Sequence, residues 1–193
     1  DIYPSLRGVL SHKFVSPDDV DLKESNLVFF ATPNGIAMKY AKGLMENGVK
    51  IIDLAADFRI KDLNEWEKWY EMSHECPEIL KKSVYGLPEL NRAQIKNAQL
   101  IANPGCYPTA IQLALFPLLK EGLIDPLSII ADAKSGTSGA GKKNKVDLLM
   151  SEASENFKAY SLEGHRHKPE IEENLTKNSM LGKIKVLFVP HLL

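Results

Sequence analysis

Cysteine is scarce in this sequence: among 193 residues there are only two, Cys76 and Cys106. Two thiols in a chain of this length do not form the disulfide framework typical of small secreted proteins. We therefore expect a protein of a reducing compartment, the cytoplasm. With 44% hydrophobic residues, the chain can bury a sizeable core and needs no disulfide bond to stabilise it.

Long apolar runs and an excess of charge of one sign are also missing. The longest apolar segments, such as 27–32, are far shorter than the roughly 20 residues that span a bilayer, so we expect no membrane partner. The chain has 24 basic and 25 acidic residues, and its lysines are scattered. This balance argues against nucleic acid as a partner.

The sequence contains no G-x-G-x-x-G motif and does not begin with methionine. It opens on Asp1-Ile2-Tyr3-Pro4 and ends on the apolar segment 186–193. We expect a fragment, truncated at both ends. If the protein binds a dinucleotide, the glycine-rich turn for it would then lie upstream of Asp1.

Apolar runs alternate with helical patterns in the first half of the chain. Runs that predict buried strands occur at 26–32, 49–57 and 98–103, and a helical pattern spans 37–45. Strands with few polar positions that alternate with helices favour a parallel sheet covered on both faces. We expect the polar and aromatic segment 61–91 to form a helix and a long loop at the sheet edge.

The second half is expected to form a further layer of mixed sheet and helices. Strands are predicted at 127–135 and 184–190, and an extended segment at 160–167. Helices are predicted after Cys106 with a kink at Pro117, at 146–157, and from Pro169 onward. We place the domain boundary near Cys106.

Cys106 lies in the segment ANPGCYPTA, between a predicted strand and a predicted helix. There the unpaired N–H groups and the positive dipole end of the helix stabilise a thiolate and could hold an oxyanion. Gly105 allows close approach of a substrate to the backbone. The segment therefore makes Cys106 a candidate nucleophile, although a buried, inert cysteine is the alternative.

The segment EGHRHKPE supplies a possible partner for that cysteine. In an extended segment, alternation places His165 and His167 on the same side, and histidine is the usual base for a cysteine nucleophile. A solvated basic loop is the alternative. A zinc site would also be possible with Cys106 or with His74-Glu75-Cys76, but no paired Cys-x-x-Cys exists, so we expect no metal.

The segment SGTSGAGKK, at 135–143, nearly matches a P-loop. Lys143 stands where that motif needs Ser or Thr for magnesium, and Ala140 stands where a serine-hydrolase elbow needs glycine. Small residues still expose backbone N–H groups, so this loop could hold a phosphate. Arg59 follows a predicted strand at the end where an α/β sheet places its ligands, and it could also face a phosphate.

Six segments identify a resemblance to a known family; in chain order they are AADFR, VYGLPEL, NPGCYPTA, SGTSGAGKK, EGHRHKPEI and VPHL. Together they resemble the N-acetyl-gamma-glutamyl-phosphate reductases of the aspartate-semialdehyde dehydrogenase superfamily. The resemblance covers essentially the whole chain. It implies an α/β fold in which a partial Rossmann-type NADP-binding domain at 1–105 precedes a partial α+β catalytic and dimerisation domain at 106–193.

The resemblance also implies a mechanism. Cys106 would attack an acyl phosphate and form a thioester, NADPH would reduce it to a semialdehyde, and His165 would move the protons. The residues implied to bind the substrate, or each other, are Arg59, Tyr107, Arg166, His167 and Glu170. The implied cofactor contacts are Thr32, Pro33, Asn34, Ser135, Gly136, Ser138 and Gly139, with Thr-Pro-Asn where many members of the family have Leu-Pro-His.

The partners implied are a small-molecule acyl phosphate, NADP(H) and further copies of the chain in a dimer or tetramer. Three alternatives stay open at this point. The first is a reductase of lysine biosynthesis that acts on a carrier-bound aminoadipyl phosphate and uses the same pair of a cysteine nucleophile and a histidine. A P-loop-like phosphate-binding module would explain only the loop at 135–143, and the chain could also be a folded fragment without activity.

Overall fold

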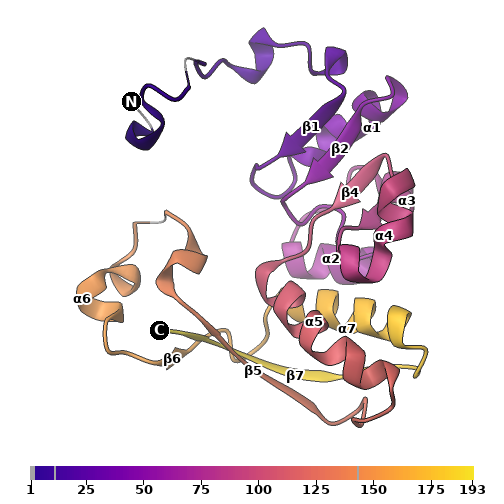
Figure 1. Cartoon of the computed structure of the whole chain (residues 1–193), viewed down its shortest axis with the longest axis vertical. Coiled ribbons are helices and arrows are strands. Elements are labelled where there is room, and N and C mark those ends of the chain that lie inside the picture. The colour runs from indigo at the N-terminus through magenta and orange to yellow at the C-terminus, as the bar shows by residue number, and fades with distance from the viewer. Residues whose placement is uncertain (1–2, 11, 143) are drawn as a thin grey trace.

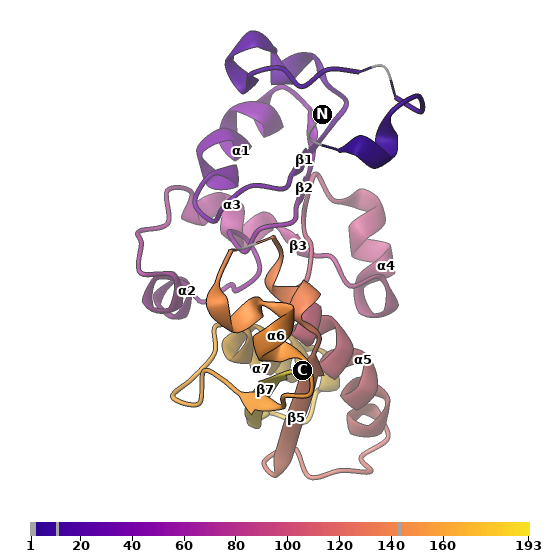
Figure 2. The ribbon, with the colours of Figure 1, turned by 90° about the vertical axis from the view of Figure 1, so that its left-hand side faces the viewer.

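The computed structural model describes residues 3–10, 12–142 and 144–193. The start of the chain at Asp1 and the P-loop mismatch at Lys143 lie outside these residues. Figures 1 and 2 show two sheets, one above the other along the long axis of the molecule, with helices packed beside them. Three short 3-10 helices precede the first strand, at Pro4–Leu6, Pro17–Asp19 and Leu22–Glu24.

The first sheet has four parallel strands in the order β1-β2-β4-β3. Its strands are β1 (Leu27–Phe30), β2 (Lys50–Asp53), β3 (Val84–Tyr85) and β4 (Leu100–Ala102). Phe30 pairs with Asp53 and Asp53 with Ala102, so the carboxyl ends of β1, β2 and β4 lie side by side at one end of the sheet. The expected parallel sheet is confirmed, and its ligand-binding edge is the one that leads into Cys106.

The strand predicted at 49–57 is shorter than expected. It ends at Asp53 because the Asp53 carboxylate accepts the Ala55 N–H at 2.9 Å and turns the chain out of the sheet. The following turn brings Asp57 under the first helix, where its carboxylate accepts the N–H groups of Gly35 (2.8 Å) and Met38 (3.1 Å). A distant carboxylate thus caps a helix N-terminus that has no cap of its own.

Four helices surround this sheet: α1 (Ala37–Glu46), α2 (Leu63–Tyr70), α3 (Pro77–Lys82) and α4 (Pro88–Asn97). The prediction of one helix and a long loop at 61–91 is therefore wrong. Asp62 caps α2 by accepting the Glu65 N–H, and prolines begin α3 and α4, so each short helix has its own start signal. The sheet core contains Phe58, Ile60 and Trp66, all fully buried.

The second sheet is mixed, in the order β5-β7-β6. Its strands are β5 (Ile129–Ser135), β6 (Lys158–Ala159) and β7 (Val186–Leu192). β5 and β7 are parallel, and β6 is antiparallel to β7. The two long helices α5 (Cys106–Lys120) and α7 (His167–Ser179) pack together beside this sheet.

Two expectations for the second half need correction. The helix predicted at 146–157 is only a 3-10 turn at Val146–Leu148 and the short helix α6 (Met150–Ala153), because Leu149 between them is extended. The helix predicted from Pro169 begins two residues earlier, at His167. His167 is therefore helical and not part of an extended segment. Pro117 lies in the last turn of α5, which ends at Lys120.

Candidate active site

Cys106 is the first residue of α5, and the chain reaches it directly from the carboxyl end of β4. Gly105 is the N-cap, with an extended backbone and no side chain to satisfy the first N–H groups of the helix. Cys106 is exposed, whereas its neighbours Gly105 and Tyr107 are buried. The predicted placement at a helix N-terminus is correct, and the free dipole end favours a negative charge on the thiol.

Gly105 is fixed by hydrogen bonds at both its N–H and its carbonyl oxygen, and side chains surround its Cα. Its N–H donates to Glu170 Oε1 at 2.8 Å, and its carbonyl oxygen accepts from the Thr109 hydroxyl at 2.9 Å. A Cβ on this residue would lie 2.8 Å from His167 Nε2 and 3.1 Å from Arg59 Nη1. Only glycine fits, because no side chain can share the space in which these two side chains approach the backbone.

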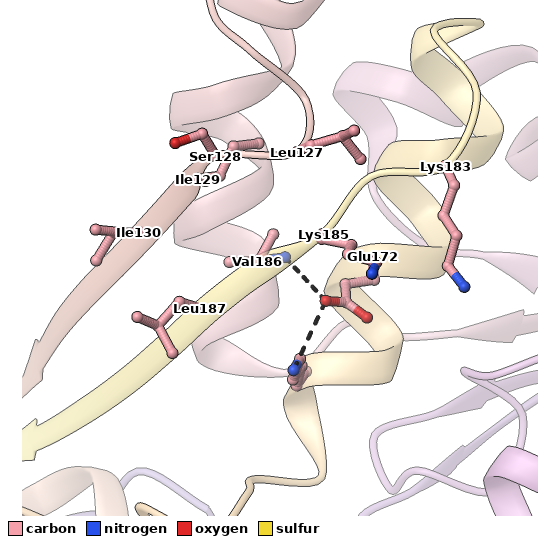
Figure 3. Close-up of a pocket in the computed structure, with 10 residues that line it drawn as sticks. Leu127, Ser128, Ile129, Ile130, Glu172, Lys183, Lys185, Val186 and Leu187 are labelled. Atoms are coloured by element: carbon pink, nitrogen blue, oxygen red, sulfur yellow. Dashed lines mark hydrogen bonds and ion pairs between the residues drawn. The ribbon is translucent and has the colours of Figure 1, made fainter.

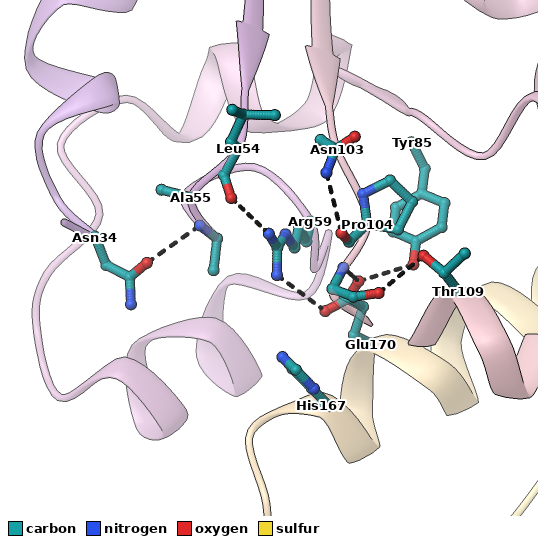
Figure 4. A network of polar contacts seen from close by, with 12 residues as sticks. Asn34, Leu54, Ala55, Arg59, Tyr85, Asn103, Pro104, Thr109, His167 and Glu170 are labelled. Atoms are coloured by element: carbon teal, nitrogen blue, oxygen red, sulfur yellow. Dashed lines mark hydrogen bonds and ion pairs between the residues drawn. The ribbon is translucent and has the colours of Figure 1, made fainter. Parts of the chain in front are cut away.

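Glu170 is fully buried and central to the network in Figure 4. Its Oε1 accepts from the Tyr85 hydroxyl as well as from Gly105 N–H, both at 2.8 Å, and Arg59 Nη1 lies 3.7 Å from Oε2. Burial raises the pKa of Glu170, while Arg59 and these two donors act in the opposite direction. Glu170 therefore contacts Arg59 and the backbone next to Cys106.

His165 and His167 lie close together, with their ring centroids 4.6 Å apart. His165 Nδ1 accepts the backbone N–H of His167 at 3.0 Å, so the neutral ring of His165 carries its hydrogen on Nε2. Burial and the adjacent Arg166 lower the pKa of His165 to about 4. Burial lowers the pKa of His167 to about 3, and His165, Arg59 and Arg166 add to this effect. Both rings are neutral at pH 7.

Two guanidinium groups accompany the histidines. Arg59 is nearly buried, donates from Nη2 to the Leu54 carbonyl at 2.8 Å, and has a buried Nε with no partner among the described residues. Arg166 precedes α7 and is exposed. The site thus combines a thiol at a helix N-terminus with one anchored and one exposed positive charge, an arrangement suited to an anionic substrate.

Tyr107 forms a wall of the site. Its hydroxyl donates to the His191 carbonyl (3.2 Å) and accepts from the Tyr160 hydroxyl (3.1 Å), and its ring centroid lies 6.1 Å from that of His165. Burial, the hydrogen bond to Tyr107 and the charges of Tyr107 and Cys106 raise the pKa of Tyr160. Tyr160 is therefore a neighbour of Cys106 that the sequence did not point to.

The residues implied to contact a cofactor come from two loops. Thr32, Pro33 and Asn34 follow β1, where Asn34 Oδ1 accepts the Ala56 N–H at 3.2 Å and the buried Thr32 Oγ1 has no partner among the described residues. Ser135 ends β5, and the residues after it form a 3-10 turn at Thr137–Ala140. That four-residue turn is not the long helix start of a P-loop.

The loop after β5 lies against a cavity. Ser135 and Ala140 line it together with Tyr160, and its volume is about 340 Å³. Gly139 approaches Ser135 so closely that a Cβ would lie 2.4 Å from Ser135 Oγ, and Gly136 is exposed and unobstructed. Among the described residues that line this cavity, Tyr160 also contacts Tyr107 of the thiol site, and Cys106 itself does not line it.

A second cavity, of about 480 Å³, lies outside the site (Figure 3). It is lined by the start of β5, by Lys183 and Lys185 before β7, and by Lys168 and Glu172 of α7. Glu172 Oε1 accepts the Val186 N–H at 2.8 Å. Within residues 3–10, 12–142 and 144–193 no group of three or more His, Cys, Asp or Glu side chains could hold a metal ion, and the zinc alternative gains no support.

Sequence reasoning missed several residues of this site: Tyr85, Thr109, Gln112 and Tyr160. VYGLPEL was noticed only as part of a resemblance, and no periodicity marks Tyr85 as a partner of a glutamate 85 residues later. Cys76, by contrast, lies at the start of α3, where its thiol donates to the Met38 carbonyl oxygen at 3.4 Å.

Comparison with known proteins agrees with this geometry. The sequence model described as "Semialdehyde dehydrogenase, NAD binding domain" matches residues 1–98, and "Semialdehyde dehydrogenase, dimerisation domain" matches residues 106–193. The chain belongs to the semialdehyde dehydrogenase family. This family assignment confirms the α/β class: an NAD(P)-binding domain with a parallel sheet, followed by a dimerisation domain with a mixed sheet.

Individual members of the family are similar over the whole chain. The protein named N-acetyl-gamma-glutamyl-phosphate reductase of Nitrosomonas europaea is 56% identical over 192 residues, and that of Acinetobacter baylyi is 56% identical over 196 residues. Both matches cover 100% of this chain and 56% of the relative, so the chain spans just over half the length of these relatives.

A solved structure with low sequence identity to this chain has a similar fold. The crystal structure of aspartate semialdehyde dehydrogenase II from Vibrio cholerae superimposes with a TM-score of 0.61 at 16% identity, over 92% of this chain and 54% of that one. Among the described residues, no helix is both long and apolar enough to cross a membrane.

Proposed function

We propose that the protein reduces N-acetylglutamyl 5-phosphate to N-acetylglutamate 5-semialdehyde with NADPH, through a thioester on Cys106, as a step of arginine biosynthesis. One observation carries the proposal: an exposed cysteine at a helix N-terminus, beside two neutral histidines and two arginines, in a chain 56% identical to proteins named for this reaction. A biosynthetic enzyme of this kind with two free thiols suits the cytoplasm.

The first step is attack by sulfur on the acyl carbon. The helix N-terminus stabilises the thiolate of Cys106, and the guanidinium groups of Arg59 and Arg166 attract the acyl phosphate. A bond forms between Sγ and the acyl carbon, the bond from that carbon to the phosphate oxygen breaks, and the departing phosphate takes up a proton. The product is a thioester, with the acyl group attached to the first turn of α5.

His165 supports this step as a hydrogen-bond donor. Its neutral ring carries hydrogen on Nε2, which can donate to the acyl oxygen as negative charge develops there. Taking the proton of the Cys106 thiol would require the other tautomer, in which the bond from His167 N–H to Nδ1 is broken. We therefore propose Nε2–H donation as the role of His165 in the resting enzyme.

The residues of the glycine-rich loop fit part of a dinucleotide site. The cavity beside Ser135 and Tyr160, the exposed Gly136 and the unpartnered Thr32 Oγ1 offer small residues and polar atoms of the kind that hold a phosphorylated cofactor. When bound, NADPH supplies the hydride that reduces the thioester. Thr32, Pro33, Asn34, Ser135, Gly136, Ser138 and Gly139 are the residues proposed to hold it.

The roles of the other residues follow from their contacts. Arg59 and His167 are proposed to face the substrate anion because they approach Gly105, and Arg166 because its charge acts on His167. Glu170 is proposed to act on Arg59 and Gly105, since its buried carboxylate is occupied by protein donors. We also propose a homo-oligomer assembled through the dimerisation domain, with the domain division between residues 105 and 106.

The test compares two substrates with the intact protein. Turnover of each is measured as the rate of NADPH oxidation. We expect turnover of N-acetylglutamyl phosphate and at least 100-fold lower kcat/KM for carrier-linked aminoadipyl phosphate, because differential contacts with the substrate determine specificity. Cys106→Ser serves as the blank and should show no turnover. Preference for the carrier-linked substrate would assign the protein to the lysine-type reaction.

A further inference from the structure

A continuous chain of hydrogen bonds leads to the residue before the nucleophile. Gln112 Nε2–H donates to the Tyr85 hydroxyl oxygen at 2.8 Å, and the Tyr85 hydroxyl donates to Glu170 Oε1 at 2.8 Å. The same carboxylate oxygen accepts Gly105 N–H at 2.8 Å. Gln112 sets the direction: its amide nitrogen donates to the Tyr85 hydroxyl oxygen, which leaves the hydroxyl hydrogen for Glu170 Oε1. Figure 4 shows Tyr85 and Glu170 converging on this point.

The chain lies entirely inside the protein. Gln112 and Glu170 are 0% exposed and Tyr85 is 4% exposed, so water cannot replace a lost partner. Its members come from three elements: Tyr85 from β3, Gln112 from α5 and Glu170 from α7. A buried polar network of this kind fixes the relative positions of the elements that it joins, provided that each member keeps its partner.

We propose that Tyr85 is a positioning residue for the reaction of Cys106. Through Glu170 it holds Gly105 N–H and thereby the first turn of α5, which directs the thiol and the free backbone N–H groups toward the acyl group. The proposal rests on the proposed function as far as the reaction is concerned. The hydrogen-bond chain can nevertheless be tested on the thiol alone.

The location of the chain argues for a role beyond stability. Its end point is the backbone N–H adjacent to the nucleophile, and Thr109 holds the carbonyl oxygen of the same residue at 2.9 Å. Both polar groups of Gly105 are thus fixed, while the Cys106 side chain next to it stays exposed. Preorganisation of this kind affects the rate more than substrate affinity.

The protein contains a matched control for Tyr85. Tyr70 in α2 is also a nearly buried tyrosine, but its hydroxyl has no hydrogen-bond partner among the described residues. Changing Tyr70 to Phe removes the same hydroxyl from a buried ring and breaks no such chain. Tyr85→Phe and Tyr70→Phe therefore differ in the contact under test.

The experiment measures three quantities in the intact protein for wild type and both variants. They are kcat and KM for N-acetylglutamyl phosphate, the rate of Cys106 alkylation by iodoacetamide with peptide mapping, and the melting temperature. For Tyr85→Phe we expect kcat to fall about tenfold with KM changed less than about twofold, and alkylation of Cys106 to slow several-fold, the scale of one lost buried hydrogen bond. Tyr70→Phe should match wild type in kcat and alkylation.

Gln112→Leu is the second variant, and it tests the positioning role if Tyr85→Phe does not fold. It removes the donor to Tyr85 and keeps the Tyr85–Glu170 bond, so its kcat and alkylation rate should lie between those of wild type and Tyr85→Phe. Without a value for Tyr85→Phe, a kcat equal to that of Tyr70→Phe would overturn the proposal.

Two outcomes separate this proposal from the proposed function. If kcat and alkylation are the same in Tyr85→Phe and Tyr70→Phe, Tyr85 has only a structural role and the proposal is overturned, whatever happens to the melting temperature. If wild type does not reduce the acyl phosphate but Tyr85→Phe still slows Cys106 alkylation relative to Tyr70→Phe, the hydrogen-bond chain stands and the proposed function fails.

Discussion

Asp53 carries a fully buried carboxylate at the carboxyl end of β2. Oδ1 accepts the Ala55 N–H, whereas Oδ2 has no partner within the described part of the chain. Burial raises the pKa of Asp53 to about 7, and the neighbouring Asp57 contributes in the same direction. Between about pH 4 and pH 7, Asp53 therefore keeps its proton in the folded protein, whereas the unfolded chain has released it.

This difference makes stability depend on pH. Between about pH 4 and pH 7 the folded state binds more protons at Asp53 than the unfolded state, so the stability that Asp53 contributes is present at low pH and lost as pH rises through 7. Asp53→Asn keeps the Oδ1 acceptor and cannot ionise. We expect its free energy of unfolding, relative to wild type, to rise on the order of 2–4 kcal/mol between pH 4 and pH 8 in urea titrations.

Asp125→Asn is the matched control. Asp125 also accepts an N–H two residues ahead, from Leu127 at 2.9 Å, but it is exposed to water. Its substitution should leave the pH profile of wild type unchanged. If Asp53→Asn and Asp125→Asn give parallel pH profiles, the pKa of Asp53 is the same in the folded and unfolded protein, and burial does not raise it.

At the scale of elements, α2 supports the loop that carries His165. The ring of Trp69 lies so close to Gly164 that a Cβ there would lie 2.8 Å from Trp69 Cη2. Gly164 has a φ of +144°, a conformation that favours glycine. The loop before α7 is therefore shaped by a helix of the first domain, and the positions of His165 and His167 depend on it.

Gly164→Ala should thus cost both stability and activity. Backbone strain and the Trp69 contact together are expected to lower the free energy of unfolding by roughly 2–3 kcal/mol, and the displaced His165 should lower kcat about tenfold. Unfolding in urea and steady-state kinetics measure the two effects. Trp69→Leu in the same chain should restore part of the activity by opening space.

Gly182→Ala separates the two causes. Gly182 has a φ of +81° and open space around it, so alanine there adds strain without a collision. Its kcat should equal that of wild type. An equal loss of kcat in Gly164→Ala and Gly182→Ala would show that the contact with Trp69 does not position the histidines.

The elements also show what the sequence can predict. Apolar runs long enough to read, such as 98–103, correctly indicated parallel strands, and the strand-to-helix junction placed Cys106 at a helix start. The segment 61–91 was misread because its helices are short and β3 has only two residues, too few for a period. The prolines that begin α3 and α4 were the signal that could have found them.

The site itself was predictable only where its residues are local. His165 and His167 were expected together, and their rings do meet, although a helix start and not strand alternation brings them there. Gln112 lies 27 positions after Tyr85, and Glu170 lies 58 positions after Gln112. No local pattern encodes such a contact, because it arises where β3, α5 and α7 pack together.

For the whole molecule, α7 is the element that joins the two halves. Glu170 accepts from Gly105, and Glu172 accepts from Val186 of β7. Glu173 accepts the N–H groups of Lys61 and Asp62, which lead from the first sheet into α2. Three glutamates within four residues of one helix thus fix the first domain, the residue before the nucleophile and the second sheet relative to one another.

The proposed function gives this arrangement one chemical event, acyl transfer to Cys106, which can be tested without any hydride transfer. The intact protein is mixed with N-acetylglutamyl phosphate in the absence of NADPH, and both released phosphate and the mass of the Cys106 peptide are measured. We predict a burst of about one phosphate per chain with the acyl group on Cys106, and no burst in Cys106→Ser. Phosphate release without an acyl adduct, or an adduct on another residue, would contradict the thioester mechanism.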